Sequence, residues 1–135
     1  MTEEARVYFG VINFNVDPRS ITEILGLSPH QTWRKDDPGP QRSRRTHDRW
    51  EFRGPKCEVA SFEEQLDELL SILEGRRDRV LQVVNQFKAG IYCTAMYRET
   101  VNPGFHLSED AIRRIAGLGL SCDFDLYILN GAEES

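Results

Sequence analysis

The chain has 135 residues and a formal net charge of −5, with 39% hydrophobic and 29% charged residues. This length predicts a single domain over residues 1–135, and the composition is that of an ordinary globular protein. The negative charge excludes a protein that binds polyanions over its whole surface, and the longest apolar runs are too short to cross a bilayer.

The N-terminal segment and the cysteines indicate the surroundings in which the protein works. The segment 1–10, MTEEARVYFG, carries acid where a secretory signal would carry lysine or arginine, so we expect a cytoplasmic protein without membrane contact. Cys57, Cys93 and Cys122 are odd in number and form no C-x-x-C pair. Their spacing argues against a disulfide framework and against a zinc site.

The N-terminal third predicts a central strand, a short helix and a loop. Residues 6–16, RVYFGVINFNV, are rich in β-branched and aromatic side chains on both faces, which is typical of a strand covered on both sides. Asp17 before a proline predicts a helix cap, and Gly26 predicts the end of that helix. We expect a short strand at 32–35, followed by a mobile loop at 36–44.

The segment 44–53, RRTHDRWEFR, predicts a half-buried antiparallel strand, because its side chains alternate in character. Trp50 and Phe52 are expected to face the core. The opposite face of this strand is expected to carry His47, Arg49, Glu51 and Arg53.

The middle of the chain predicts two consecutive helices and a strand. Ser61 and Glu64 form a capping-box pattern that starts a helical segment over 62–87. Gly75 interrupts this segment, so it is expected to contain two helices. A further strand is expected at 90–99, where β-branched and aromatic residues return.

The C-terminal third predicts a turn at 102–104, a helix capped by Ser108 and a last strand at 120–129. The core side of this strand is expected to carry Cys122, Phe124, Leu126 and Ile128. Its other side is expected to carry Ser121, Asp123, Asp125 and Tyr127. The tail 130–135 is expected to be mobile, which leaves an ordered core of about residues 5–129.

A short internal similarity suggests how these elements are arranged. DPRSITEILGL (17–27) and SEDAIRRIAGL (108–118) share a cap, two isoleucines, a glycine and a leucine in register. The similarity predicts two strand–helix–strand halves, although two ordinary capped helices explain it equally well. The expected fold class is α+β, with an antiparallel sheet and helices packed mainly on one face.

Charge is distributed unevenly along the chain. Seven basic residues lie in 34–53 and five acidic residues lie in 63–74, and we expect the two segments to neutralise each other. Arginines interleaved with aromatic residues in 42–53 also suit weak binding of single-stranded nucleic acid. The net negative charge and the absence of RNP-like and helix-turn-helix patterns disfavour nucleic acid.

The polar strand faces define a candidate surface for a ligand or partner. If helices cover one side of the sheet, an aromatic ring, an arginine and carboxylates line the open side, where a small molecule, a protein partner or a second copy could bind. The candidate residues are Trp33, Arg49, Glu51, Asp123, Asp125 and Tyr127. We expect Arg49 to lie against an aspartate of a neighbouring strand. The alternative is a ladder of such pairs that only keeps the face in solution, each pair contributing about 0.2–1 kcal/mol.

No pattern in the sequence assigns a catalytic residue, a cofactor or a metal. His47, Asp123 and Asp125 offer metal donors, but no H-x-x-x-H or C-x-x-C spacing completes a set, and no G-x-S-x-G elbow occurs. We therefore expect a small soluble binding or interaction module, regulatory or immunity-like, rather than an enzyme. A small-molecule enzyme or ligand-binding protein that uses the polar sheet face is the alternative.

The order of several motifs resembles a known family. The motifs are QTWRK, THDRW, SFEEQLDELLSIL, FHLSEDAIRRIAGLG and DFDLY. Over about residues 5–129, their order is similar to that of a bacterial family catalogued only as a domain of unknown function, commonly a stand-alone protein of this length. The resemblance implies a small α+β domain, and it implies no activity, cofactor or catalytic residue.

Overall fold

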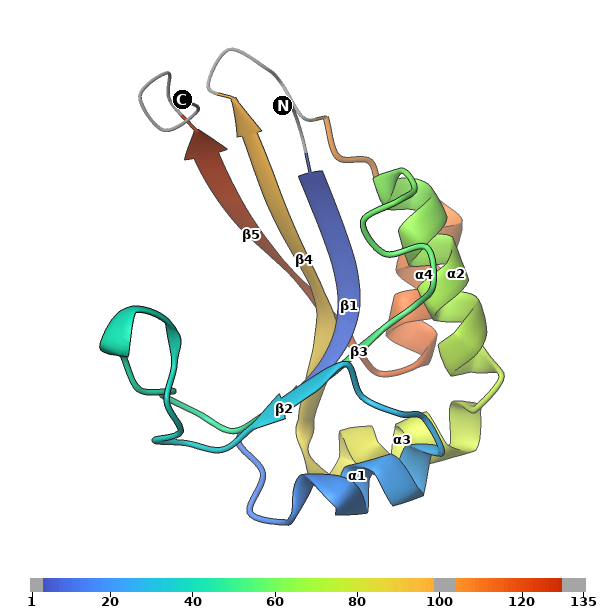
Figure 1. The fold of residues 1–135 in the computed structure, drawn as a ribbon. Helices are drawn as coiled ribbons and strands as arrows, with labels where there is room; N and C mark the ends of the chain where they lie inside the picture. Colours follow the sequence, from blue (N-terminus) through green and yellow to red (C-terminus); the bar gives the residue numbers. More distant parts are fainter. Residues whose placement is uncertain (1–3, 99–103, 130–135) are drawn as a thin grey trace.

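The structure is a computed structural model that describes residues 4–98 and 104–129. Within them the strands form one sheet in the order β2-β3-β1-β4-β5, with the helices on one side of it (Figure 1). The strands are β1 (Glu4–Ile12), β2 (Gln31–Trp33), β3 (Arg49–Arg53), β4 (Lys88–Arg98) and β5 (Ser121–Leu129). The helices are α1 (Pro18–Leu25), α2 (Phe62–Glu74), α3 (Arg77–Gln86) and α4 (Glu109–Gly117), with a short 3-10 turn η1 (Pro40–Arg42). This arrangement confirms the predicted α+β class. Most of the predicted turn at 102–104 and the tail 130–135 lie outside the described residues.

The sheet is mixed rather than purely antiparallel, because β5 runs parallel to β4. β1 is antiparallel to both β3 and β4, and β2 is antiparallel to β3. A parallel neighbour requires a crossover connection, and α4 lies in the segment that joins β4 to β5. Both predicted halves therefore link parallel strands through a helix. In the first half, however, β3 separates β1 from β2.

The core lies between the sheet and the helices that cover it. Alternate residues of β1 point toward α2 and are fully buried, namely Val7, Phe9 and Val11. Trp50 on β3 is also buried, and its Nε1 donates a hydrogen bond of 2.9 Å to Oγ1 of Thr22 on α1. Trp50 therefore belongs to the core, as the sequence predicts, and Phe52 is half-buried at its margin.

Three helices begin at the caps that the sequence predicts. Asp17, Ser61 and Ser108 each accept a hydrogen bond from a backbone N–H in the first turn of the helix that follows. The break near Gly75 separates α2 from α3, also as predicted. Within the described parts of the chain, none of the helices combines the length and the apolar character needed to span a membrane.

A buried glutamine on α2 completes the hydrogen bonding of β1 beyond the end of β3. The pairing of β1 with β3 covers β1 only from Tyr8 onward. At that end, Oε1 of Gln65 accepts from the Val7 N–H at 3.0 Å, and its Nε2 donates to the Ala5 carbonyl at 2.8 Å. The glutamine amide thus takes the place of a strand neighbour and fixes α2 against β1.

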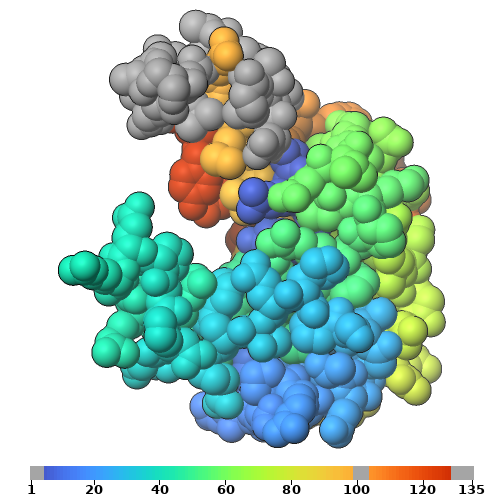
Figure 2. All heavy atoms as spheres, viewed as in Figure 1, coloured from blue at the N-terminus to red at the C-terminus, as the bar shows by residue number. Residues whose placement is uncertain are grey.

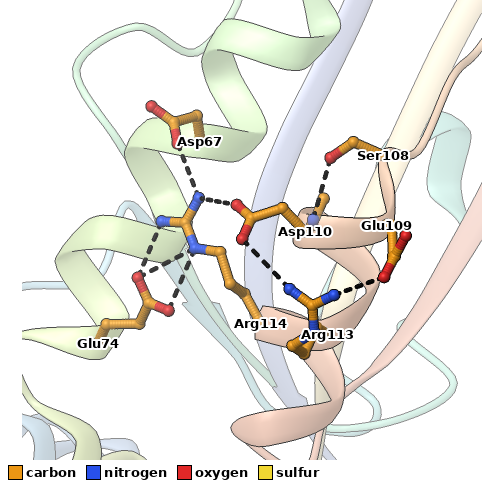
Figure 3. Close-up of polar contacts among 8 residues, drawn as sticks. Asp67, Glu74, Ser108, Glu109, Asp110, Arg113 and Arg114 are labelled. Atoms are coloured by element: carbon orange, nitrogen blue, oxygen red, sulfur yellow. Dashed lines mark hydrogen bonds and ion pairs between the residues drawn. The ribbon is translucent and has the colours of Figure 1, made fainter.

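Arg114 fastens α4 to α2 through several acceptors at once (Figure 3). Its Nε and Nη2 donate to Glu74 at 3.1 and 2.8 Å, and its Nη1 donates to Asp67 at 2.7 Å. Hydrogen bonds to Glu74 and then to Asp67 raise the pKa of the Arg114 guanidinium. Because the planar guanidinium serves several acceptors in one geometry, this contact orients α4 as well as attracting it.

The expectation that 63–74 neutralises 34–53 is wrong. Among the described residues, no ion pair joins the two segments: Asp67 and Glu74 of α2 pair with Arg114, and the basic segment pairs with its own Asp48 and Glu51. The physical reason is helix orientation. α2 packs on β1 with α4 beside it, so Asp67 and Glu74 face Arg114 of α4, while Glu68 accepts a hydrogen bond of 2.8 Å from the Lys56 backbone N–H.

The strand predicted over 44–53 is also shorter than expected, because it begins at Arg49. Asp48 ends the pairing between β2 and β3. Its Oδ1 accepts a hydrogen bond of 2.8 Å from the backbone N–H of Lys35, so a side chain replaces the next backbone contact. His47 therefore lies in the loop between the strands and does not share the strand face of Arg49.

Candidate functional site

The sheet face that points away from the helices is called the open face. Alternation along β3 and β5 places their polar residues on this face, and β2 contributes Trp33, which pairs with Arg49. Every residue of the predicted ligand or partner surface lies there: Trp33, Arg49, Glu51, Asp123, Asp125 and Tyr127.

A hollow of ≈ 320 Å³ opens on this face and is lined from four strands, β1, β3, β4 and β5. Figure 2 shows the molecule hollowed between the projecting β2–β3 loop (residues 34–48, teal) and the red atoms of β5. This volume falls at the small end of the usual range for ligand sites.

Arg49 lines one side of the hollow on the open face and is held on several sides. Its Nη2 donates to the Tyr8 hydroxyl at 2.8 Å, and its Nε donates to Glu51 at 3.4 Å. Its guanidinium carbon lies 5.2, 5.0 and 5.7 Å from the ring centroids of Tyr8, Tyr92 and Trp33. The side chain is 12% exposed. A guanidinium carries five N–H donors, and those on Nη1 have no partner among the described residues, so they can serve an anion.

Glu51 is buried beside Arg49 and is shared between two arginines. Its Oε1 lies 3.4 Å from Nε of Arg49, and its Oε2 accepts from Nε of Arg53 at 2.6 Å. Gln31 on β2 donates to the same Oε2 at 3.4 Å. One carboxylate therefore balances two guanidinium groups, so this cluster keeps a positive charge.

Gly10 makes room for the aromatic pair at the base of the hollow. Tyr8 and Tyr92 are opposite each other on β1 and β4, and their rings stack with centroids 5.8 Å apart. A Cβ on Gly10 would lie 2.8 Å from Cε2 of Tyr92, so a larger residue would displace the ring. The sequence predicts the strand that carries Tyr8 and Gly10 but not their part in the site. The pairing of β1 with β4 is the signal that identifies them.

The β2–β3 loop adds a second arginine beside the hollow. The guanidinium carbon of Arg45 lies 3.8 Å from the centroid of the Trp33 ring. Arg45 is positioned by backbone hydrogen bonds with Asp36 and Asp37 at 2.8 and 2.9 Å. Nε1 of Trp33 and Nε of Arg45 are buried and have no hydrogen-bond partner in the described part of the chain. A buried donor without an acceptor costs free energy, and an acceptor from outside would remove that cost.

Asp123, Asp125 and Tyr127 form the opposite rim, on β5. The Tyr127 hydroxyl donates to Oδ2 of Asp125 at 2.8 Å, and this hydrogen bond raises the pKa of the Tyr127 phenol. The expected contact between Arg49 and an aspartate on a neighbouring strand is wrong. β1 and β4 lie between β3 and β5, and each strand spacing adds about 4.8 Å. Arg49 and Asp123 instead line opposite sides of the hollow.

The protonation states around the hollow suit hydrogen bonding. Burial raises the pKa of the Tyr92 phenol in the hollow. On the helix side of the sheet, burial in the core raises the pKa of the Cys93 thiol to about 12. Burial, and then the charge of Arg49, lower the pKa of His47. At neutral pH these groups are therefore a hydroxyl, a thiol and a neutral imidazole, and the thiol is not an activated nucleophile.

The metal donors considered from the sequence do not meet. His47 lies in the β2–β3 loop, where its Nδ1 is 3.1 Å from the Thr46 hydroxyl, whereas Asp123 and Asp125 lie on β5. Within residues 4–98 and 104–129, no three histidine, cysteine, aspartate or glutamate side chains gather in a way that could hold a metal ion.

The fold and the open face together define a small α+β protein with one polar sheet face that its helices leave uncovered. The chain belongs to the family described as "Domain of unknown function (DUF4279)", whose model matches residues 3–129. This match confirms the resemblance to a family of unknown function and covers nearly all of the chain. Comparison with curated proteins and with solved structures gave no match.

Proposed function

We propose that this protein is a binding module whose open face holds an acidic segment of a partner protein. The observation that carries the proposal is Arg49, which Tyr8 and Glu51 hold in the hollow while part of its guanidinium remains available. A group that is already oriented loses little conformational entropy when its ligand arrives. A carboxylate that enters the hollow would receive charge-assisted hydrogen bonds from Arg49.

The charge around Arg49 supports a negative partner. Residues 34–53 hold seven basic and four acidic residues, although the whole chain is negative. Glu51 already balances part of this charge, but it is shared between two arginines. The unpaired donors of Trp33 and Arg45 lie on the same side of the face. Acceptor groups on a partner would complement both the charge and the donors.

An acidic protein segment fits this face better than single-stranded nucleic acid. Bases bind by stacking on exposed rings, but Arg45 covers Trp33, and the two tyrosines of the hollow stack on each other. The far rim carries Asp123 and Asp125, which repel a phosphate backbone and attract lysine or arginine. The preferred segment therefore has an acidic side chain toward Arg49 and a basic side chain toward β5.

The shifted pKa values near the hollow support binding rather than catalysis. Acid–base chemistry at neutral pH is most efficient with groups whose pKa lies near neutrality. Burial raises the pKa of Tyr92 away from neutrality, and the hydrogen bond to Asp125 does the same for Tyr127. A binding module of this kind acts by covering a surface of its partner, which is how a regulatory or immunity-like protein works.

Titration of the isotope-labelled full-length protein with a short polyglutamate peptide, followed by NMR, tests the proposal. We expect shifts of the Trp33 indole N–H and the Arg49 Nε–H signals. The shifts should weaken in Arg49→Lys, which keeps the charge but loses the planar pair of donors. Arg79→Lys, an exposed arginine on α3, is the matched control and should bind like the wild type.

Two comparison ligands separate the alternatives. Stronger Arg49-dependent shifts with oligothymidylate than with polyglutamate would indicate that the partner is a nucleic acid and not a protein segment. Stronger shifts with citrate would indicate a small-molecule site instead. If none of the three ligands moves the signals of Trp33 or Arg49, the open face is not an anion-binding surface.

A further inference from the structure

β5 forms an outer edge of the sheet. Its pairing with β4 is continuous from Gly90↔Ser121 to Arg98↔Leu129, and no described strand pairs with its other side. In Figure 1 the C-terminal half of β5, in red, lies far from α2 and α4. One side of this strand therefore presents backbone N–H and C=O groups that another strand can pair with.

β5 has few of the features that usually protect such an edge. Proteins protect edge strands by making them short, by placing charged residues (above all lysine), proline or a bulge in them, or by covering them. The other edge strand, β2, has three residues and leads directly into the β2–β3 loop. β5 has nine residues, SCDFDLYIL, contains no lysine or proline, and pairs with β4 without a bulge. Its charged residues are Asp123 and Asp125, both on the open face.

The helix-facing side of β5 is apolar but only partly covered. Phe124 packs against Phe62 and Phe105, with ring centroids 5.8 and 5.6 Å apart. The orientation predicted from the sequence is therefore correct, but the expected burial is wrong. Phe124, Leu126 and Ile128 remain 39%, 45% and 56% exposed, because β5 continues past the helices as an edge. Apolar side chains grouped beside an open edge favour a partner strand that covers both.

We infer that β5 pairs antiparallel with β5 of a second copy of this chain, about a two-fold axis at Leu126. Residues directly opposite each other in an antiparallel pair share a face. With the axis at Leu126, this residue meets its own copy, Phe124 meets Ile128 of the second copy, and Asp125 meets Tyr127. The apolar residues then cover one another on one face, and a carboxylate meets a hydroxyl on the other.

The aspartates exclude two of the alternative registers. With the axis at Phe124, Asp123 would lie directly opposite Asp125 of the second copy. With the axis at Asp125, this residue would lie opposite itself. Like charges directly opposite each other are destabilising, and a shift by a single residue would place apolar side chains against polar ones. With the axis at Tyr127, Asp125 would meet Leu129 instead of a hydroxyl, and Phe124 would lie opposite residue 130, beyond the described strand. The register at Leu126 therefore pairs the most complementary residues of β5, which is why a second copy is the partner inferred.

The pairing would join the two sheets into one, with the open faces side by side. The interface is isologous, since the same strand contributes from both copies. It shares Phe124 and Asp125 with the lining of the hollow, but it does not use Arg49, so the inference does not depend on the proposed binding of an acidic segment.

Sedimentation of the full-length protein over a range of concentrations tests this inference. We expect the wild type to dimerise, and Leu126→Lys and Ile128→Lys to remain monomeric with unchanged circular dichroism. Ile112→Lys, at an exposed isoleucine on α4, is the matched control and should dimerise like the wild type. A wild type that stays monomeric at all concentrations, or a dimer that persists in both β5 variants, would overturn the inference.

Cross-linking tests the register. Leu126→Cys should form a disulfide-linked dimer under mild oxidation, because the two residues at the axis are about 4.5–5.5 Å apart between Cβ atoms. The wild type, which retains Cys57, Cys93 and Cys122, and Ile112→Cys are the controls and should not cross-link. Cross-linking of Ile112→Cys with none in Leu126→Cys would place the interface on α4 and reject β5.

Discussion

The ring of Tyr92 occupies the space that a side chain at Gly10 would fill. A Cβ at Gly10 would lie 2.8 Å from Cε2 and 2.9 Å from Cδ2 of that ring, on the neighbouring strand. Tyr92 in turn stacks on Tyr8, whose hydroxyl accepts the hydrogen bond from Arg49. The position of Arg49 on the open face therefore depends on a residue that has no side chain.

Gly10→Ala should destabilise the protein by about 1–3 kcal/mol, the usual cost of adding atoms to a packed position. Urea unfolding measures this loss. Combining the change with Tyr92→Ala should give less than the sum of the two single effects, because the clash is then absent. Gly75→Ala is the control, since its Cβ would lie 3.4 Å from the nearest atom. An unchanged unfolding midpoint for Gly10→Ala would show that the ring moves aside freely.

Glu51→Ala should be more destabilising, by about 3–5 kcal/mol, because it leaves two guanidinium groups without their buried carboxylate. Added salt should recover part of the loss by screening the two positive charges from each other. Glu109→Ala removes a carboxylate from an exposed ion pair on α4 and should have a much smaller effect. Equal losses in the two variants would contradict the central role of Glu51 in the cluster.

Local patterns predicted which way side chains point, because alternation and capping are properties of short segments. Trp50 is in the core and Arg49 is on the opposite face, as their spacing implies. The predicted start of β3 was wrong because the Asp48 carboxylate, rather than a backbone carbonyl of β3, accepts the hydrogen bond from the Lys35 N–H. Such competition depends on a contact across 13 residues, which periodicity does not reveal.

The sequence predicted which sheet face carries the candidate site, but not which residues of that face touch, because contacts across a sheet depend on strand order. Arg49 and Asp123 share the open face, but two strands lie between them, and no periodicity indicates which strands are neighbours. The same limit hid Tyr8 and Tyr92, which become partners only through the pairing of β1 with β4. Alternation thus identifies the face, and the order of the strands decides which of its residues touch.

Stability should fall in mild acid partly through His47. Burial holds the pKa of His47 in the folded protein below its ordinary value of 6.5. In mild acid, His47 therefore binds a proton more readily in the unfolded chain than in the folded one. Stability is then unaffected by this group above pH 6.5 and declines as the pH falls from there toward the folded pKa. His47→Asn should show a shallower decline in urea unfolding between about pH 7 and pH 5. An identical decline in wild type and variant would assign the acid sensitivity to other groups.

Arg114→Lys should loosen α4 without unfolding the protein. Lysine keeps the positive charge but places it at one point, so it cannot serve Glu74, Asp67 and Ser71 together as the guanidinium does. Native-state hydrogen exchange should show the amides of α4 opening about tenfold more often, which corresponds to about 1.4 kcal/mol of local stability. The amides of α3 should be unchanged.

Arg113→Lys is the matched control on the same helix, because Arg113 pairs only with acids of α4 itself among the described residues. In the Arg113→Lys variant, the amides of α4 should exchange close to the wild-type rate. If both variants accelerate exchange equally, charge alone holds α4, and the geometry of Arg114 in Figure 3 is not what fixes it. If only Arg114→Lys does so, the forked contact with α2 positions α4, and through it the crossover that sets β5 parallel to β4 at the edge of the sheet.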